Sequence, residues 1–147
     1  HFPTTAAAAF PDHHERVADL VARLHDGAPH ANPLLHLRRV MISRFDSTTP
    51  TRLARYALLS TSSDLRDEDA RTDRDYEDAI AAYLTAHWGA GVEAELRARA
   101  IANAVIGVFR AALVASGEHG FDARDVTAEI LQKMFGGPFD EPLHSVH

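Results

Sequence analysis

The apolar positions near the start of the chain fall on helical faces rather than in the alternation typical of strands. After Asp12, a residue type that favours helix starts, four apolar residues occupy positions i, i+3, i+4 and i+7: Val17, Leu20, Val21 and Leu24. Gly27 is expected to end this helix. Asn32 and Pro33 favour the start of a second helix, whose predicted buried face is Leu34, Leu37, Val40, Met41 and Phe45.

Start and stop residues of the same kinds delimit the rest of the chain. They predict further helices over residues 4–10, 50–60, 64–88, 92–116 and 122–135. The segment 92–116 is apolar around much of its circumference, which is typical of a helix buried on more than one side. No segment has a convincing strand pattern. The sequence therefore predicts an all-α bundle of six or seven helices in one domain.

Composition removes several classes of protein. The 147 residues include no cysteine, which excludes disulfide scaffolds, thiolate metal sites and cysteine nucleophiles. The formal charge of −6 disfavours nucleic-acid binding by this segment alone, because affinity for phosphates comes from Lys and Arg. No apolar run approaches the roughly 20 residues that cross a bilayer, and no secretion signal is visible. We expect a cytoplasmic protein without membrane contact.

Catalytic and metal-binding patterns are also lacking. The ten histidines do not follow a helical metal-ligand spacing such as H-E-x-x-H, and they are expected at the surface. The acidic run from Asp64 to Asp75 lacks the central glycine of an EF-hand loop, which favours a solvated helix face. Nucleophile-elbow and phosphate-loop motifs do not occur. We expect no enzyme, no metal and no cofactor.

Several segments, in their order, resemble TetR-family transcriptional regulators. The opening His1-Phe2-Pro3-Thr4-Thr5 is similar to the Tyr-Phe-Pro-Ser/Thr-Lys stretch that joins the family's recognition helix to its regulatory domain. The resemblance continues through Leu65-Arg66, the stop at Gly89, Leu96-Arg97-Ala98-Arg99 and Ala104-Val105-Ile106-Gly107-Val108-Phe109-Arg110-Ala111-Ala112-Leu113. These last segments look like the subgroup with the mycofactocin-regulator type of C-terminal domain.

The resemblance implies a division of the chain. Residues 1–10 would end a linker from a DNA-binding domain, residues 11–138 would form the ligand-binding and dimerisation domain, and residues 139–147 would be a loose tail. Thr5 stands where the family usually has a lysine near a DNA phosphate, so that contact is not expected here. The helix-turn-helix is not among these residues, and we expect it upstream of His1.

The resemblance also implies a partner. TetR regulators dimerise through their last two long helices, which here correspond to residues 92–116 and 122–135. We expect a homodimer with C2 symmetry. Its predicted interface residues are Val105, Val108, Ala112, Val126, Ile130 and Met134. The alternative is that these apolar residues belong to the chain's own core.

The family binds a small effector inside the bundle and thereby controls operator DNA binding. Polar or aromatic residues on apolar faces are the candidate effector ligands: Met41, Phe45, Tyr56, Ser60, Tyr83, His87 and Asn103. Asn103 is the strongest candidate, since a buried amide needs partners. The alternative roles are core packing for Met41 and Phe45, surface placement of the hydroxyls for Tyr56 and Tyr83, and capping of a helix end for His87. A fatty acyl-CoA or an aromatic compound would suit such a pocket.

Two other functions compete with a regulatory domain. A helical interaction or structural module would need no ligand, and a fully packed interior would favour it. An enzyme that used His87 with an acidic partner is the third possibility, although the acidic residues lie on the half of their helix expected to be solvated.

Overall fold

The computed structural model describes residues 12–47 and 63–135, and this part of the chain is all-α. It consists of α2 (His13–His25), α3 (Pro33–Ser43), the 3-10 helix η1 (Arg44–Ser47), α5 (Ser63–Trp88), α6 (Val92–His119) and α7 (Ala123–Phe135). The all-α prediction is confirmed for these ranges, which contain five α-helices and no strand. The predicted helices over residues 4–10 and 50–60 lie outside them.

Local chemistry fixes several helix ends as the sequence predicted. The Asn32 side chain accepts a hydrogen bond from Leu35 N at 3.1 Å, and Pro33 occupies the first turn of α3. Asp122 Oδ1 accepts from Arg124 N at 2.9 Å. Asp12 differs, because it precedes α2 but its side chain makes no capping hydrogen bond.

Glycine in the left-handed conformation ends three of the helices. Gly27, Gly89 and Gly120 have φ values of 74°, 95° and 75°, which other residues adopt only with strain. At the end of α6, the N–H of Gly120 donates to the Ser116 carbonyl at 2.8 Å. These turns reverse the chain between successive helices.

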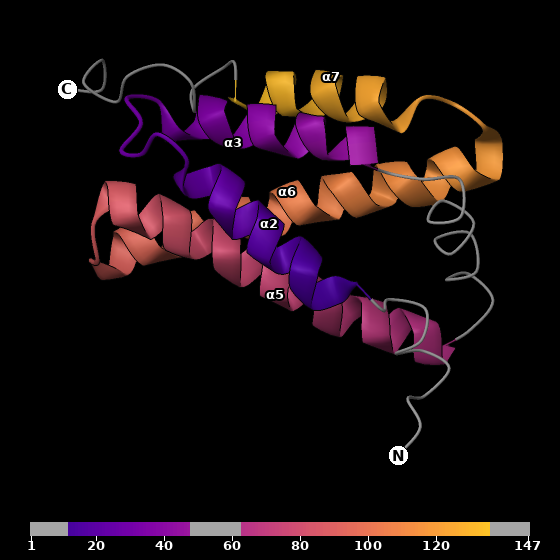
Figure 1. The fold of residues 1–147 in the computed structure, drawn as a ribbon, viewed down its shortest axis with the longest axis horizontal. Coiled ribbons are helices and arrows are strands. Elements are labelled where there is room, and N and C mark those ends of the chain that lie inside the picture. Colours follow the sequence, from indigo (N-terminus) through magenta and orange to yellow (C-terminus); the bar gives the residue numbers. More distant parts are fainter. Residues whose placement is uncertain (1–11, 48–62, 136–147) are drawn as a thin grey trace.

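The helices form a bundle in which α5 and α6 make a long antiparallel hairpin (Figure 1). α2 lies across α5, and α3 runs beside α7 on the other side of the bundle (Figure 1). α7 packs against both α6 and α3. The core therefore lies between the α5–α6 hairpin and the pair formed by α3 and α7, with α2 closing one side.

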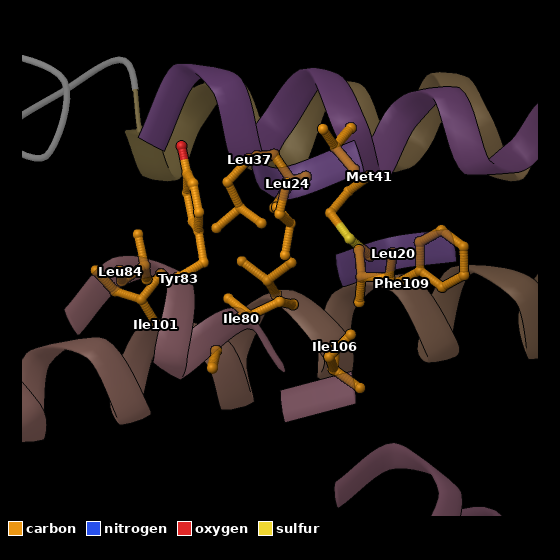
Figure 2. Packing of buried hydrophobic residues seen from close by; sticks show 14 of the residues in the cluster. Leu20, Leu24, Leu37, Met41, Ile80, Tyr83, Leu84, Ile101, Ile106 and Phe109 are labelled. Carbon is orange, nitrogen blue, oxygen red and sulfur yellow. The ribbon is translucent and has the colours of Figure 1, made fainter. Parts of the chain in front are cut away.

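The predicted apolar faces of α2 and α3 largely form this core. Leu20, Leu24 and Leu37 are fully buried, and Met41 is 1% exposed (Figure 2). Burial of such side chains contributes about 1.5–3 kcal/mol each. Val21 was expected on the same face but is 39% exposed, because the face of α2 that contacts the bundle is narrower than the apolar stripe.

α6 is amphipathic in the structure, although its sequence predicts a helix buried on more than one side. Residues such as Ala98, Val105 and Leu113 are buried, whereas Val92 and Leu96 are 86% and 67% exposed. Among the described residues, α6 has the length and apolar composition of a membrane span. Core helices of bundles share that composition, and α6 packs against α5 and α7, so this feature assigns no membrane location.

Candidate functional site

A small cavity lies where five elements of the bundle meet. Its volume is about 20 Å³, which is the space of one water molecule. α2, α3 and η1 contribute one residue each, and α5 and α6 contribute the rest. The lining residues are Arg16, Met41, Arg44, Asp73, Tyr76, Ile106, Phe109 and Arg110.

Arg44 is the most deeply buried charged residue of this cavity. Its exposed fraction is 4%, and its guanidinium lies over the Tyr76 ring, 5.4 Å from the centroid. Its Nη1 is 3.5 Å from the Arg16 carbonyl, to which it donates, and 3.6 Å from Asp19 Oδ2. Burial, with a smaller contribution from the charge of Arg16, lowers the pKa of Arg44 to about 10. The site thus holds a desolvated cation.

The other cationic groups of the cavity differ in how they are held. Arg110 Nε forms an ion pair with Asp73 Oδ2 at 2.6 Å, and only 14% of the Asp73 side chain is exposed. The expectation of a solvated acidic face on α5 is therefore wrong for Asp73, because α6 covers it. Arg16 Nε is buried without a hydrogen-bond partner in the described part of the chain.

The apolar part of the lining includes one predicted site residue. Met41 lines the cavity together with Ile106 and Phe109. Phe45 is not in the lining, but its ring packs on Phe109 with centroids 4.5 Å apart. Met41 and Phe45 are therefore next to a cavity and also part of the core, as the alternative interpretation proposed.

Tyr83 and His87 lie at a second place, where histidines from two regions gather. The Tyr83 hydroxyl is 2.6 Å from His30 Nδ1, and His87 Nε2 accepts from His30 N at 2.9 Å. The rings of His30 and His36 stack with centroids 3.7 Å apart, and His25 packs edge-on to Tyr83. We call these five residues the histidine cluster. None of these four histidines is fully buried, which agrees with the expected surface location, but their gathering around Tyr83 was not predicted.

The hydrogen bonds of the histidine cluster define its proton positions. Carbonyl oxygens only accept, so His30 Nε2 donates to Asp26 O at 2.9 Å and His87 Nδ1 donates to Tyr83 O at 3.0 Å. His87 Nε2 is then the acceptor for His30 N, and the Tyr83 hydroxyl donates to His30 Nδ1. Burial raises the pKa of Tyr83 to about 12, which keeps this donor protonated.

The polar atoms of Tyr83, His30 and His87 pair with one another or with nearby backbone carbonyls, which is the behaviour of a structural network. His87 closes the loop before α3 rather than only capping α5, because it holds the backbone of His30. Residues 12–47 and 63–135 contain no group of three or more His, Cys, Asp or Glu arranged to hold a metal ion.

The predicted effector ligands are not gathered in one place. Met41 and Tyr83 lie on opposite sides of Leu24 and Leu37 (Figure 2). Tyr56 and Ser60 lie outside the described residues. Asn103 is exposed, so the argument from a buried amide is wrong. In the orientation that its neighbours satisfy, its amide donates to Glu77 Oε2 and to the Arg99 carbonyl, each at 3.3 Å.

The predicted dimer-interface residues fall into two groups, those buried in the chain's own core and those at least partly exposed. Val105 and Ala112 are 0% and 5% exposed and belong to the chain's own core, so they are wrong as interface residues. Ile130 is 39% exposed, and the remaining three are partly buried: Val108, Val126 and Met134.

A different row of apolar residues lies on the outer side of α6. Its members are at least partly exposed and recur at helical spacing, and we call them the α6 stripe: Leu96, Ala100, Gly107, Ala111 and Val114. A Cβ added at Gly107 would have no atom within 4 Å. A shallow groove follows the end of this stripe along Arg110 and Ala115.

Sequence reasoning missed the charged residues of the cavity, although a signal for them exists. Arg44 lies three residues after Met41 and seven after Leu37, in register with the buried face of α3. Arg16 lies four residues before Leu20 in the same way. A cation in register with an apolar face is an indication of a buried polar site.

Comparison with known proteins finds no matching family model, no similar curated protein and no similar solved structure. The fold and cavity define an all-α helical bundle with a small, arginine-lined interior site. The resemblance to TetR regulators rests on the residues quoted for it above.

Proposed function

We propose that this chain is the regulatory domain of a TetR-like transcriptional repressor, which binds a small apolar effector and pairs with a second copy. The observation that carries the proposal is the cavity, where apolar side chains and a few placed polar groups converge inside the bundle. In this proposal, operator DNA is bound by a helix-turn-helix domain that precedes residue 1.

The position of the cavity supports control at a distance. Its lining comes from α2, α3, η1, α5 and α6, so a ligand that widens it changes how these elements pack. α6 contributes Ile106 and Phe109 to the cavity and carries the α6 stripe on its other side. A ligand with different affinities for two arrangements of α6 would shift the equilibrium between them.

The α6 stripe supports the homodimer. Small residues at Ala100, Gly107 and Ala111 allow close approach of another helix, and Leu96 would lose its 67% exposure on pairing. Sedimentation equilibrium at micromolar concentration tests this part. A mass of twice the 16.1 kDa chain supports it, and a mass of 16.1 kDa contradicts it.

A screen by thermal shift tests effector binding, with acyl-CoA esters and aromatic compounds as probes. A ligand at one hundred times its dissociation constant adds about 2.7 kcal/mol to apparent stability. A compound that raises Tm should also change operator binding by the full-length protein in a gel-shift assay. Absence of any basic helix-turn-helix segment upstream of residue 1 would contradict the repressor assignment.

One observation favours the second candidate function, a helical interaction module without a ligand. The cavity of about 20 Å³ admits one water-sized group, and the surrounding core is closely packed. An effector therefore requires the helices to separate. A dimer that gives no thermal shift with any compound of the screen would favour the interaction module.

A further inference from the structure

His87 makes both of its hydrogen bonds in the histidine cluster only in its neutral form. Its Nδ1 donates to the Tyr83 carbonyl at 3.0 Å, and its Nε2 accepts from the backbone N–H of His30 at 2.9 Å. A protonated imidazole has two donors and no acceptor. Protonation of His87 would therefore place an N–H group opposite the N–H of His30 and break this hydrogen bond.

The hydrogen bond between His87 and His30 connects two parts of the fold. His87 lies in the last turn of α5, and His30 lies in the loop over residues 26–32 that joins α2 to α3. His30 Nδ1 also bonds the Tyr83 hydroxyl at 2.6 Å, but a hydroxyl can accept as well as donate. The bond to His87 is thus the contact between the loop and α5 that requires a neutral imidazole.

Positive charge on the rings would be poorly compensated. The rings of His30 and His36 stack with centroids 3.7 Å apart, and those of His30 and His87 stack with centroids 5.8 Å apart. In the described part of the chain, the two histidines that form ion pairs lie outside the cluster, His13 on α2 and His119 on α6. Two imidazolium ions in the cluster would therefore repel each other without a paired carboxylate.

The ionisable residues next to His30 and His87 come from α2 and its end, from α3 and from α5: Arg23, His25, Asp26, His36 and Tyr83. Arg23 and Asp26 take part through their backbone carbonyls, which accept from His36 Nε2 and His30 Nε2. The Arg23 guanidinium pairs with Asp19 at 3.0 Å. Within the described ranges, α6 and α7 add no hydrogen bond or ion pair to these rings. Histidine is the residue type among them that ordinarily changes charge between about pH 5 and 8.

We propose that the histidine cluster is an acid-sensitive latch, which holds the loop over residues 26–32 on α5 while His87 is neutral and releases it when His87 is protonated. His87 is only partly buried, so protons from solvent reach it. The latch is closed above the ordinary titration range of histidine and opens as the pH falls through that range. It shares no residue with the cavity or the α6 stripe, so it stands apart from the proposed function.

Nitrogen-15 NMR of the imidazole rings tests the closed latch at about pH 7.5, where histidine is ordinarily neutral. We expect His87 to carry its proton on Nδ1 and to have Nε2 unprotonated, as the hydrogen bonds to Tyr83 and His30 require. A proton on Nε2 would overturn the latch, because this nitrogen could then not accept from the backbone of His30.

Amide hydrogen exchange tests the opening of the latch, with rates at about pH 7.5 and 5.5 corrected for intrinsic exchange. Protection of the His30 amide should fall about tenfold at the lower pH, because its hydrogen bond is lost and two donors then face each other. Amides in the middle of α5 and α6 should keep their protection. Unchanged protection at His30 would overturn the proposal, and so would an equal loss throughout the chain.

His87→Gln is the decisive variant, and His119→Gln is its matched control. Glutamine offers an acceptor oxygen but does not titrate near neutral pH. Protection of the His30 amide should therefore be independent of pH in His87→Gln, high if the new side chain replaces the hydrogen bond and low if it does not. It should keep its pH response in His119→Gln, since His119 is exposed at the end of α6. A pH response that persists in His87→Gln would overturn His87 as the trigger.

Discussion

Tyr83 shows how the chemistry of one residue depends on its place in the fold. Its side chain is fully buried, and its hydroxyl connects α5 to His30 in the loop before α3. The apolar ring packs in the core, while the polar end takes part in the histidine cluster. One side chain therefore stabilises both the core and a loop.

Replacement of Tyr83 by Phe should lower the free energy of unfolding at neutral pH by about 1–2 kcal/mol, because His30 Nδ1 loses its donor while the ring stays packed. Urea unfolding followed by circular dichroism measures this difference. Tyr76→Phe is the control, since the Tyr76 ring is only partly buried and lies outside the histidine cluster. An unchanged stability of Tyr83→Phe would contradict a structural role for the hydroxyl.

The stabilities of the original protein and of Tyr83→Phe can also be compared at different pH values. The pKa of Tyr83 is raised from 10.0 to about 12 in the folded state, so its contribution is complete below pH 10 and is lost as the pH rises toward 12. The Phe variant lacks this loss. We expect the stability difference between the two proteins to narrow above pH 10, as measured by urea unfolding at several alkaline pH values. A constant difference would indicate that Tyr83 titrates alike in both states.

Replacement of Thr127 should raise the free energy of unfolding rather than lower it. Its side chain is fully buried in α7, and its Oγ1 has no hydrogen-bond partner in the described residues. Thr127→Val replaces the hydroxyl with a methyl group of similar shape. The free energy of unfolding should rise by about 1 kcal/mol, because a buried polar group without a partner is removed. A fall in stability in urea unfolding would mean that the hydroxyl is paired.

At the scale of elements, the helix ends depend on local chemistry and the helix faces depend on neighbours. Asn32 and Asp122 act on backbone groups within one turn, and Gly120 closes α6 through its own left-handed conformation. Which side of α6 is exposed depends instead on the helices that pack against it. Its exposed side also carries apolar residues such as Leu96 and Ala100, and the packing of α5 and α7 decides which side is buried.

Two glycines of α6 should respond in opposite directions to alanine. Gly107 is inside the helix, so Gly107→Ala should raise the free energy of unfolding by about 0.5–1 kcal/mol. Gly120 has φ 75°, so Gly120→Ala should lower it by about 1–2 kcal/mol. An added Cβ meets no atom within 4 Å at either position, so crowding does not explain the difference. Thermal unfolding of both variants, at concentrations that give the same oligomeric state, measures it.

At the scale of the whole molecule, the α6 stripe and the cavity lie on two sides of one helix. This arrangement couples pairing and ligand binding in the proposed function, since both depend on where α6 lies. The core residues Val105 and Ala112 hold α6 to its own chain and leave the α6 stripe on the outer side of the helix.

Gly107→Arg should break the proposed homodimer, because a long charged side chain would fill the space that close helix approach requires. We expect the dimer dissociation constant to rise at least about tenfold, or 1.4 kcal/mol, by sedimentation equilibrium. Ala22→Arg places the same side chain on an exposed position of α2 and serves as the control. If both variants dimerise like the original protein, the α6 stripe is not the interface.

Much of the fold could be predicted from sequence, but little of the candidate site. The start of α3 at Pro33 and the buried positions Leu20, Leu37 and Met41 follow from signals that act within a few residues. The cavity unites Arg16 with Arg110, and no local pattern relates these two positions. The prediction that Asn103 is buried is wrong, because the apolar pattern of residues 92–116 does not show which side of the helix faces solvent.

By itself, the sequence determined where the helices begin and which positions on α2 and α3 are apolar, since caps, glycines and periodicity act through backbone geometry within one or two turns. The predicted end of α6 at residue 116 was wrong, because this helix continues to His119. The tertiary structure decided which face of α6 is covered, that Arg44 is buried, and that His30 meets His87 across 57 positions of the chain. Those contacts depend on how helices cross. Many crossings are compatible with the same local patterns, and the packing of the whole core selects one of them.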